Sequence, residues 1–194
     1  MEPRFIHLHV HTEYSLVDGV IRIKPLMQNC LENGMPAVAL TDQTNMFATI
    51  KFDRAARAAG VKPIMCLDVL IQARESNDEP HRMVLLAQDH DGYINLSELI
   101  SQAYLEGQHS GQPIVEMEWI KQHSKGVIAL SGGREGEIGK ALLAGNTDLA
   151  ASMLNEWTEV FGDRFYLELQ RTGRLNEENY IHAAVKLATA TQTP

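Results

Sequence analysis

The stretch FIHLHVHTEYSLVDG, residues 5–19, is the part of this sequence around which the rest is interpreted. Its first half predicts a strand, because apolar residues alternate there with three histidines. Side chains two positions apart leave the same face of an extended chain, so His9 and His11 project together, about 6–7 Å apart along the strand. Asp18 and Gly19 then form a predicted turn. Two imidazoles next to a carboxylate are typical ligands of a divalent metal ion.

The composition predicts one globular domain. The chain has 194 residues, of which 44% are hydrophobic and 22% are charged. No apolar run reaches the roughly 20 residues that cross a bilayer, and the N-terminus lacks the features of a signal peptide. Cys30 and Cys66 form no CxxC pattern, so we expect reduced thiols and a cytoplasmic location. The net charge of −8 argues against this segment binding a nucleic-acid backbone by itself.

Apolar runs and helical periodicity alternate along the chain. The opening strand is followed by predicted strands over residues 36–42, 62–73, 82–88, 126–132 and 164–170. Predicted helices cover residues 23–32, 47–60, 93–107, 117–124, 135–143, 147–160 and 177–190. The third and fourth strands are joined by a short link and are expected to pair antiparallel. The overall alternation predicts a parallel α/β fold, either a barrel or a doubly wound sheet.

Further polar residues stand at the ends of predicted strands, where α/β barrels carry their chemistry. Asp42, Asp68 and Glu168 could join His9 and His11 around divalent ions that activate water. Asp42 has an equally good alternative as a turn or helix-capping residue. Asp68 and Glu168 lie among apolar neighbours, and a buried carboxylate is either a ligand or part of a salt bridge. The histidines in loops and helices are expected at the surface: His81, His90, His109, His123 and His182.

Six motifs resemble the N-terminal PHP (polymerase and histidinol phosphatase) domain of bacterial DNA polymerase III alpha subunits. They are HLHVHTEYSLVDG, PAVALTDQTNM, AGVKPIMCLDVLI, DGYINLSELISQAY, GVIALSGGREGEIGKALL and RFYLELQRTGR. The resemblance runs from residue 4 to the end of the chain. It implies a single PHP domain over residues 1–194 with a distorted (β/α)7 TIM-like barrel whose last strand is truncated. It also implies that the polymerase regions lie beyond Pro194.

The resemblance also supplies a metal-ligand pattern, and this sequence matches about half of it. His9, His11, Asp18 and Asp42 match, and Asp68 stands at a glutamate position. Other ligand positions carry residues that are expected to disrupt the site: Gln43, Arg82, Gly133, Arg171 and Thr172. A guanidinium group at a ligand position competes with a metal ion for the carboxylates. Arg82 or Arg171 could therefore pair with Asp68, Asp42 or Glu168.

From this pattern we expect a non-catalytic structural module that binds no cofactor tightly. The resemblance implies that it docks a proofreading exonuclease subunit of the epsilon type within the polymerase III holoenzyme. The full-length parent would be a DNA-directed DNA polymerase that contacts DNA through the missing regions, with no membrane partner. The alternative is a metal-dependent phosphoesterase, either a residual 3′–5′ exonuclease or a pyrophosphatase, with Zn, Mn or Mg at a vestigial site. A small-molecule phosphatase is a weaker third hypothesis.

Overall fold

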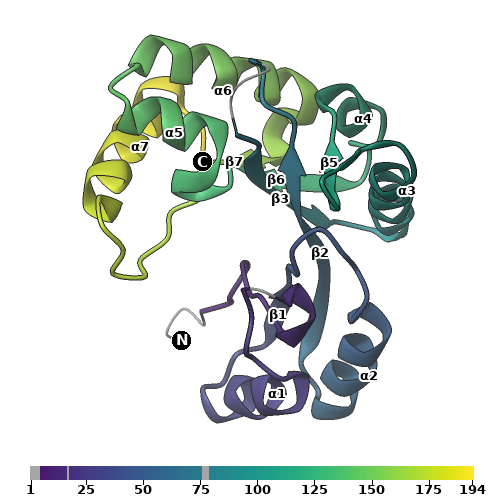
Figure 1. Cartoon of the computed structure of the whole chain (residues 1–194). Coiled ribbons are helices and arrows are strands. Elements are labelled where there is room, and N and C mark those ends of the chain that lie inside the picture. Colours follow the sequence, from purple (N-terminus) through teal and green to yellow (C-terminus); the bar gives the residue numbers. More distant parts are fainter. Residues whose placement is uncertain (1–4, 17, 76–78) are drawn as a thin grey trace.

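A single long strand, β2 (Lys62–Ile71), connects the two halves of the molecule. The structure is a computed structural model that describes residues 5–16, 18–75 and 79–194. Around the lower half of β2 in Figure 1 lie α1 (Ile23–Glu32), β1 (Ala37–Leu40) and α2 (Thr49–Ala59). The first half of β2 pairs with β1 and its second half pairs with β3 (His81–Ala87). Because β2 is long enough to pair with a strand in each half, it is part of both halves.

The sheet is mixed, which corrects the prediction of a parallel sheet. Its strand order is β4-β5-β2-β3-β6-β7, with β1 paired to β2. β3 runs antiparallel to both β2 and β6 (Val127–Leu130). In contrast, β1 and β5 (Gln112–Val115) run parallel to β2, and β7 (Phe165–Tyr166) runs parallel to β6. The antiparallel pairing of β2 with β3 confirms the expectation from their short link. The sequence did not reveal β5 or the two-residue strand β4 (Gln108–His109), which form a small hairpin.

The opening stretch, predicted as a strand, is not one of the strands in the described part of the chain. It still runs beside β1, because the Ala39 amide donates to the His7 carbonyl oxygen at 2.9 Å and the Thr41 amide donates to that of Val10 at 3.0 Å. The Thr41 hydroxyl also accepts the Val10 amide at 2.7 Å. This hydroxyl replaces a backbone ladder bond, so the stretch is attached to the sheet without completing a ladder.

The helices agree with the sequence prediction to within a few residues. The upper half contains α3 (His90–Glu106), α4 (Met117–Gln122), α5 (Glu137–Leu143), α6 (Thr147–Phe161) and α7 (Glu177–Thr191). Gly60 ends α2 in the left-handed conformation, with φ of 71°, as expected for a C-terminal glycine. None of the helices in the described ranges is long and apolar enough to cross a bilayer.

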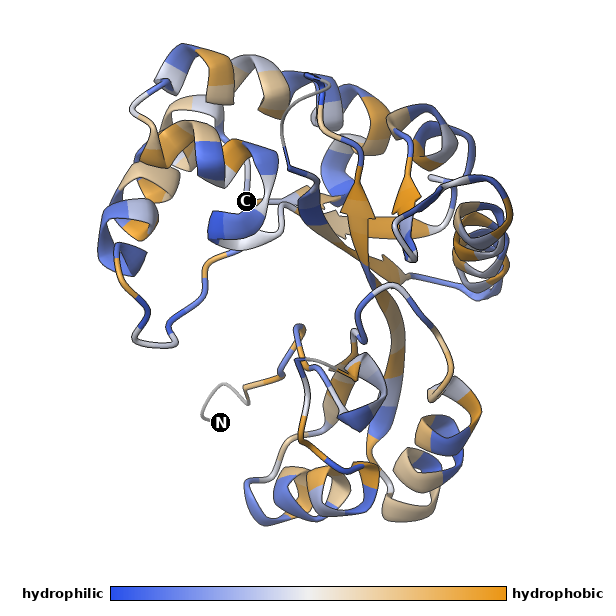
Figure 2. Cartoon of the chain, viewed as in Figure 1, coloured by the Kyte–Doolittle hydropathy of each residue, from blue (hydrophilic) through white to orange (hydrophobic). Residues whose placement is uncertain are grey.

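The apolar residues form a large core between the sheet and α3–α7, and a smaller one around α1, β1 and α2. The strands are correspondingly the most hydrophobic elements, and the outer helix faces are polar (Figure 2). A third cluster, containing Cys66, Leu86 and Leu130, lies on the face of the sheet that lines a cleft of about 2000 Å³. The opening stretch and the segment after β7 lie on the two sides of this cleft. The described residues therefore form an open sheet, and the predicted closed barrel is not seen.

Candidate functional site

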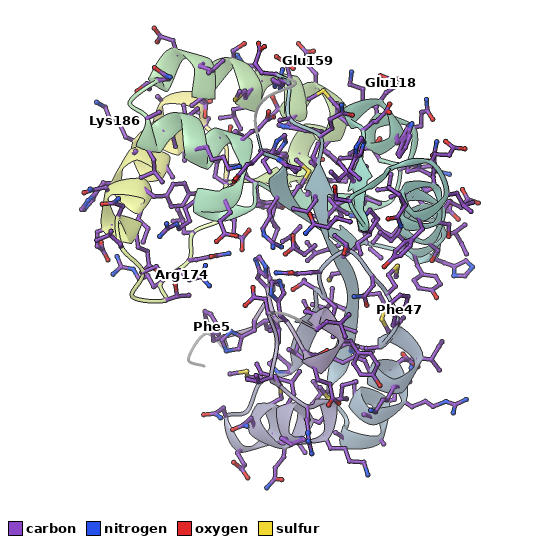
Figure 3. The ribbon with its side chains drawn as sticks, in the orientation of Figure 1. Phe5, Phe47, Glu118, Glu159, Arg174 and Lys186 are labelled. Carbon is purple, nitrogen blue, oxygen red and sulfur yellow. The ribbon has the colours of Figure 1, made fainter. Side chains whose placement is uncertain are left out.

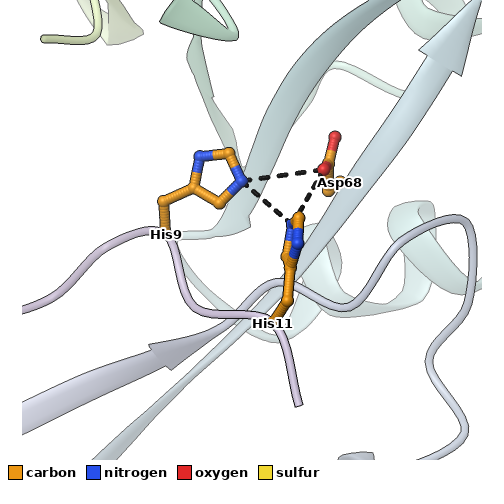
Figure 4. A group of neighbouring side chains, drawn as sticks. All are labelled: His9, His11 and Asp68. Atoms are coloured by element: carbon orange, nitrogen blue, oxygen red, sulfur yellow. Dashed lines mark hydrogen bonds and ion pairs between the residues drawn. The ribbon is translucent and has the colours of Figure 1, made fainter. Parts of the chain in front are cut away.

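Three of the predicted site residues meet at one side of the cleft. Nε2 of His9, Nε2 of His11 and Oδ2 of Asp68 all lie within 4.8 Å of one another (Figure 4). The two Nε2 atoms are 3.1 Å apart, and Nε2 of His11 lies 3.0 Å from Oδ2 of Asp68. The histidines come from the opening stretch and Asp68 from the middle of β2. The hypothesis that His9 and His11 project together is therefore confirmed, and Asp68 is their shared acidic partner.

A guanidinium group binds the same carboxylate. Nη1 of Arg82 donates to Oδ2 of Asp68 at 2.6 Å, and its Nε lies 3.0 Å from Oε2 of Glu135. Asp68 is fully buried, whereas the Arg82 side chain is one-fifth exposed. Burial alone raises the pKa of the Asp68 carboxyl, but contacts with His11, His9 and Arg82 outweigh it and hold the pKa at about 2. Asp68 is thus an ionised carboxylate that already has a permanent cationic partner.

Glu168 reaches His9 from the other side of the cleft. Oε1 of Glu168 lies 2.6 Å from Nδ1 of His9 and accepts a hydrogen bond from Nε2 of Gln170 at 2.7 Å. Burial lowers the pKa of His9, but its contacts with Asp68 and Glu168 outweigh that effect and raise the pKa to about 10. His9 is therefore an imidazolium at neutral pH. Its ion pair with Glu168 links the opening stretch to the segment after β7.

The backbone of Glu168 is fixed by two hydroxyl groups. Its amide donates to Oγ of Ser131 at 3.0 Å, and its carbonyl oxygen accepts from the Tyr180 hydroxyl at 2.6 Å. Ser131 follows β6 and Tyr180 lies on α7, so two elements of the upper half hold Glu168 in place. The sequence analysis identified Glu168 but not Gln170, Glu135 or Tyr180, because each of these acts through a contact between elements far apart in the chain.

Asp42 is placed next to the site but serves the loop. It is buried and accepts hydrogen bonds from the Thr12 amide at 2.6 Å, the Thr12 hydroxyl at 2.8 and 2.9 Å, and the Ser15 hydroxyl at 2.8 Å. These donors occupy both carboxylate oxygens. These donors lie 27–30 residues away, in the opening stretch, so Asp42 anchors that stretch and does not make the local turn or helix-capping contacts expected of it.

Asp18 and Gln43 form the outer side of the site. Oδ2 of Asp18 lies 3.4 Å from Nδ1 of His11 and accepts from Nε2 of Gln43 at 2.9 Å. The Asp18 side chain is more than half exposed. Gln43, expected as a disrupting residue, therefore holds Asp18 beside His11 by a neutral hydrogen bond and does not itself belong to the cluster of three ligand atoms.

The remaining predicted disrupting residues lie around the cleft without contacting that cluster. Gly133 is buried beside Gln170, since a Cβ atom added there would lie 3.4 Å from Cδ of Gln170. Arg171 pairs with Glu178 at 2.9 Å, so the suggestion that Arg171 neutralises Asp68, Asp42 or Glu168 was wrong. Thr172 donates its amide and hydroxyl to Oε2 of Glu177, at 2.6 and 2.8 Å. The loop after β7 turns toward the N-terminus of α7 for these partners, which carries Arg171 away from the cluster.

One histidine that was expected at the surface is buried. His81, at the start of β3, is 4% exposed and its Nε2 lies 3.8 Å from Oε2 of Glu137. Glu137 accepts from Trp157 Nε1 and from both Nε and Nη2 of Arg74. Burial lowers the pKa of His81 to about 4, so it is neutral at pH 7. The network attaches the β2–β3 connection to α5 and α6 and lies outside the cleft.

A metal ion fits this residue set poorly. Two buried oxygens without a hydrogen-bond partner, Oδ1 of Asp68 and Oε2 of Glu168, are compatible with a cation. However, Arg82 occupies Oδ2 of Asp68, which is the oxygen that meets both histidines. The centre of the site is therefore the ion pair between Arg82 and Asp68, and we assign no metal-dependent step to it.

Comparison with known proteins places this geometry in a family. The sequence profile described as the PHP domain matches residues 7–172. Over the whole chain, the sequence is 50% identical to DNA polymerase III subunit alpha of Pseudomonas aeruginosa and 44% identical to that of Vibrio cholerae. It is also 45% identical to the subunit of that name from Escherichia coli K12. The chain spans only 16–17% of the length of these three relatives.

A solved structure shares the fold at low sequence identity. It is a protein from Bifidobacterium adolescentis named as a candidate metal-dependent phosphoesterase. The TM-score is 0.57 and the identity 13%, and the match covers 98% of this chain and 85% of that one. At this identity the likeness concerns the fold alone. The profile match over residues 7–172 and the arrangement of His9, His11 and Asp68 lead to the same conclusion: this chain belongs to the PHP domain family.

Proposed function

We propose that this chain is a non-catalytic structural PHP domain of a bacterial DNA polymerase III alpha subunit. The observation that carries the proposal is the 2.6 Å ion pair between Arg82 and Asp68 at the centre of the site. A guanidinium is permanently charged and presents fixed donors, so it neutralises the buried carboxylate without any ion. We propose that the domain binds no metal tightly for this reason. The sequence identity of 44–50% with the three polymerase relatives supports the part of the proposal that places this chain in a polymerase III alpha subunit.

We further propose that the longer polypeptide completes the (β/α)7 barrel. The relatives are much longer than this chain, and the cleft is bordered by the segments that would be neighbours in a closed barrel. The amide of Leu167, just after β7, already donates to the carbonyl oxygen of Pro194 at 2.9 Å. A strand added beside β7 would continue this contact and cover the apolar cleft lining. Residues 1–194 would then form most of one PHP domain, with the DNA-directed polymerase activity located in the remainder of the protein.

As its role within the polymerase, we propose docking of a proofreading exonuclease subunit. The family resemblance supports this partner, and the acidic charge of −8 supports a protein rather than DNA as the direct contact of this domain. The remaining holoenzyme subunits and DNA would contact other parts of the polymerase. The ion pairs of the site join separate elements of the fold, and a domain stabilised in this way can present a fixed surface to a partner without catalysing a reaction.

Two measurements on the full-length polymerase test this proposal. Elemental analysis after purification should find zinc and manganese far below one ion per chain. A binding titration with the exonuclease subunit should saturate at one partner per polymerase, and deletion of residues 1–194 should abolish it. Stoichiometric, tightly bound metal would contradict the metal-free site, and unchanged binding after the deletion would contradict the docking role.

The second candidate is a metal-dependent phosphoesterase, acting as a 3′–5′ exonuclease or a pyrophosphatase. It is favoured by the convergence of His9, His11 and Asp68 and by the two unpartnered buried oxygens. Zn, Mn or Mg would then displace Arg82 from Asp68. The test is hydrolysis of a primer terminus or of pyrophosphate with added Mn²⁺, sensitive to EDTA and lost in His9→Ala. Activity equal to that of the variant would exclude this candidate.

A further inference from the structure

Glu135 holds the guanidinium group that occupies the centre of the site. Its Oε2 lies 3.0 Å from Nε of Arg82, and its Oε1 accepts a hydrogen bond from Nη1 of Arg174 at 2.9 Å. The carboxylate therefore gives one oxygen to each arginine. With Asp68 on the other side of Arg82, the four side chains form a line of alternating charge. This line runs from β2 through β3 and η2 (Gly133–Glu135) to the loop after β7.

The turn that carries Glu135 packs directly against the backbone of Arg82. Gly132 precedes η2 in the left-handed conformation, with φ of 75°, and a Cβ atom added to it would lie 2.1 Å from the Arg82 carbonyl oxygen. A Cβ atom added to Gly136, which follows η2, would lie 1.8 Å from the Ser131 carbonyl oxygen and 3.2 Å from that of Arg82. Glycine at both positions is what allows the turn to lie this close. The position of Glu135 relative to Arg82 is therefore built into the backbone.

The ion pair with Glu135 determines the direction in which the Arg82 guanidinium group points. The group is planar and its donors have fixed directions, so a partner at Nε also sets the direction of Nη1. Nη1 of Arg82 then meets Oδ2 of Asp68 at 2.6 Å. The Arg82 side chain is one-fifth exposed and lines the cleft, so it has room to turn into the cleft when Glu135 is removed. A long side chain released in this way gains rotamer entropy, which favours its departure from Asp68.

Arg174 holds Glu135 from the other side and is itself fixed by its loop. Nη1 of Arg134 donates to the Leu175 carbonyl oxygen at 2.5 Å, which ties this loop to η2. Figure 3 shows Arg174 at the end of the upper half that faces Phe5, and both residues line the cleft. The Glu135 side chain is 43% exposed, and an isolated ion pair at this exposure stabilises little, whereas charges joined in a network restrict one another. Two arginines together therefore hold Glu135 in one orientation.

We infer that Glu135 is a positioning residue that keeps Arg82 on Asp68 and thereby excludes a divalent cation from the site. This inference rests on the proposed metal-free function and names the residue on which that function depends. The group of three ligand atoms comes from His9, His11 and Asp68, so Glu135 acts on it through Arg82. When Arg82 leaves, Oδ2 of Asp68 and the two imidazoles become available together, and such a donor set suits zinc.

The test measures binding of Zn²⁺ alone to the full-length polymerase by equilibrium dialysis. Arg82→Ala should create a zinc site that the wild type lacks, because it frees Asp68. Glu135→Ala should strengthen Zn²⁺ binding by about tenfold or more relative to the wild type, which is the size of effect that residues contacting a ligand have on metal affinity. A purely structural contribution of Glu135 would lower stability without creating any affinity for zinc.

Two further variants locate the effect. Glu178→Ala is the matched control, because Glu178 forms an exposed ion pair with Arg171 and should leave zinc binding at the wild-type level. Adding His9→Ala to Glu135→Ala should remove the zinc binding that Glu135→Ala gained. Loss of the gain in the double variant assigns the zinc to the site of His9, His11 and Asp68.

The outcomes separate the inference from the proposed function. If Arg82→Ala binds zinc and Glu135→Ala binds it no better than the wild type, Glu135 does not position Arg82 and the inference fails, although the metal-free function stands. If neither variant gains zinc, or if the gain also occurs in Glu178→Ala or persists after His9→Ala, the inference fails as well. Stoichiometric, tightly bound zinc in the wild type would overturn the proposed metal-free function and the inference together.

Discussion

Nη1 of Arg82 lies 2.6 Å from Oδ2 of Asp68, and this is the same carboxylate oxygen that faces Nε2 of His9 and His11. Asp68 is completely buried, so its charge needs compensation from neighbouring groups. In a metal site that compensation would come from an ion. Here it comes from an arginine on the neighbouring antiparallel strand, which is part of the polypeptide and does not dissociate.

Removing Arg82 should therefore destabilise the domain. In Arg82→Met the aliphatic part of the side chain is largely kept while Asp68 loses its guanidinium partner. Breaking a buried pair in this way costs about 3 kcal/mol, reduced to the extent that His11 still contacts Asp68. Urea denaturation of the 194-residue chain measures the change. The matched control is Arg171→Met, since Arg171 and Glu178 form an exposed pair and should contribute less than about 1 kcal/mol. Equal effects of the two substitutions would contradict the role given to Arg82.

The interpretation of Asp42 as a loop anchor leads to a second prediction. Thr12→Val removes the hydroxyl that donates to Asp42 but preserves the shape of the side chain. Because a hydrogen bond to a buried carboxylate is lost, the free energy of unfolding should fall by about 1.5–3 kcal/mol. In Thr189→Val the lost hydroxyl bond is an exposed one to the Val185 carbonyl oxygen, and stability should change little. If Thr12→Val left the free energy of unfolding unchanged, these contacts would not anchor the loop.

His81 should make stability depend on pH in a defined window. Burial lowers its pKa from 6.5 to about 4, and the neighbouring charges of Glu137, Lys140 and Arg74 only partly offset one another. Between pH 6.5 and 4 the unfolded chain binds a proton at His81 that the folded chain does not, so stability falls as the pH decreases. A shift of this size corresponds to about 3 kcal/mol once the pH is below 4.

Melting temperatures measured from pH 7 to pH 4 check this expectation. His81→Asn removes the titrating group, so its melting temperature should decline less steeply with acid than that of the wild type. The exposed His182 provides the control, and His182→Asn should follow the wild-type curve. The carboxyl group of Asp68, with a pKa of about 2, titrates below this window. Parallel curves for wild type and His81→Asn would contradict the assignment.

The sequence revealed the elements better than their arrangement. Apolar periodicity located the helices and the longer strands, because it depends only on neighbouring residues. It predicted strands at residues 5–10 and 164–170 that are longer than those observed. Both segments lie at the open edges of the sheet, where one side of the segment has no neighbouring strand to pair with. It missed the β4–β5 hairpin, whose strands are only two and four residues long.

The candidate site shows the same division. His9 and His11 were found because two positions in an extended segment fix their relation. The pairing of Arg82 with Asp68 depends on the register of β2 against β3, in which Val84 stands opposite Asp68 and Arg82 is two residues away. Local sequence does not determine that register, so Arg82 and Arg171 remained equal candidates until the structure separated them. Gln170 contacts Glu168 two residues earlier, a local relation that the sequence analysis did not use, and it also reaches His9, which only the fold brings close.

The most direct test of the central claim, that Arg82 takes the place of a metal ion, is the metal dependence of stability. The full-length polymerase would be purified with and without EDTA, analysed for zinc and manganese, and melted with each metal added back. We predict metal far below one ion per chain and a melting transition of the PHP domain that neither EDTA nor added metal shifts. One or more tightly bound ions per chain, with a transition that EDTA lowers and zinc or manganese restores, would contradict the claim.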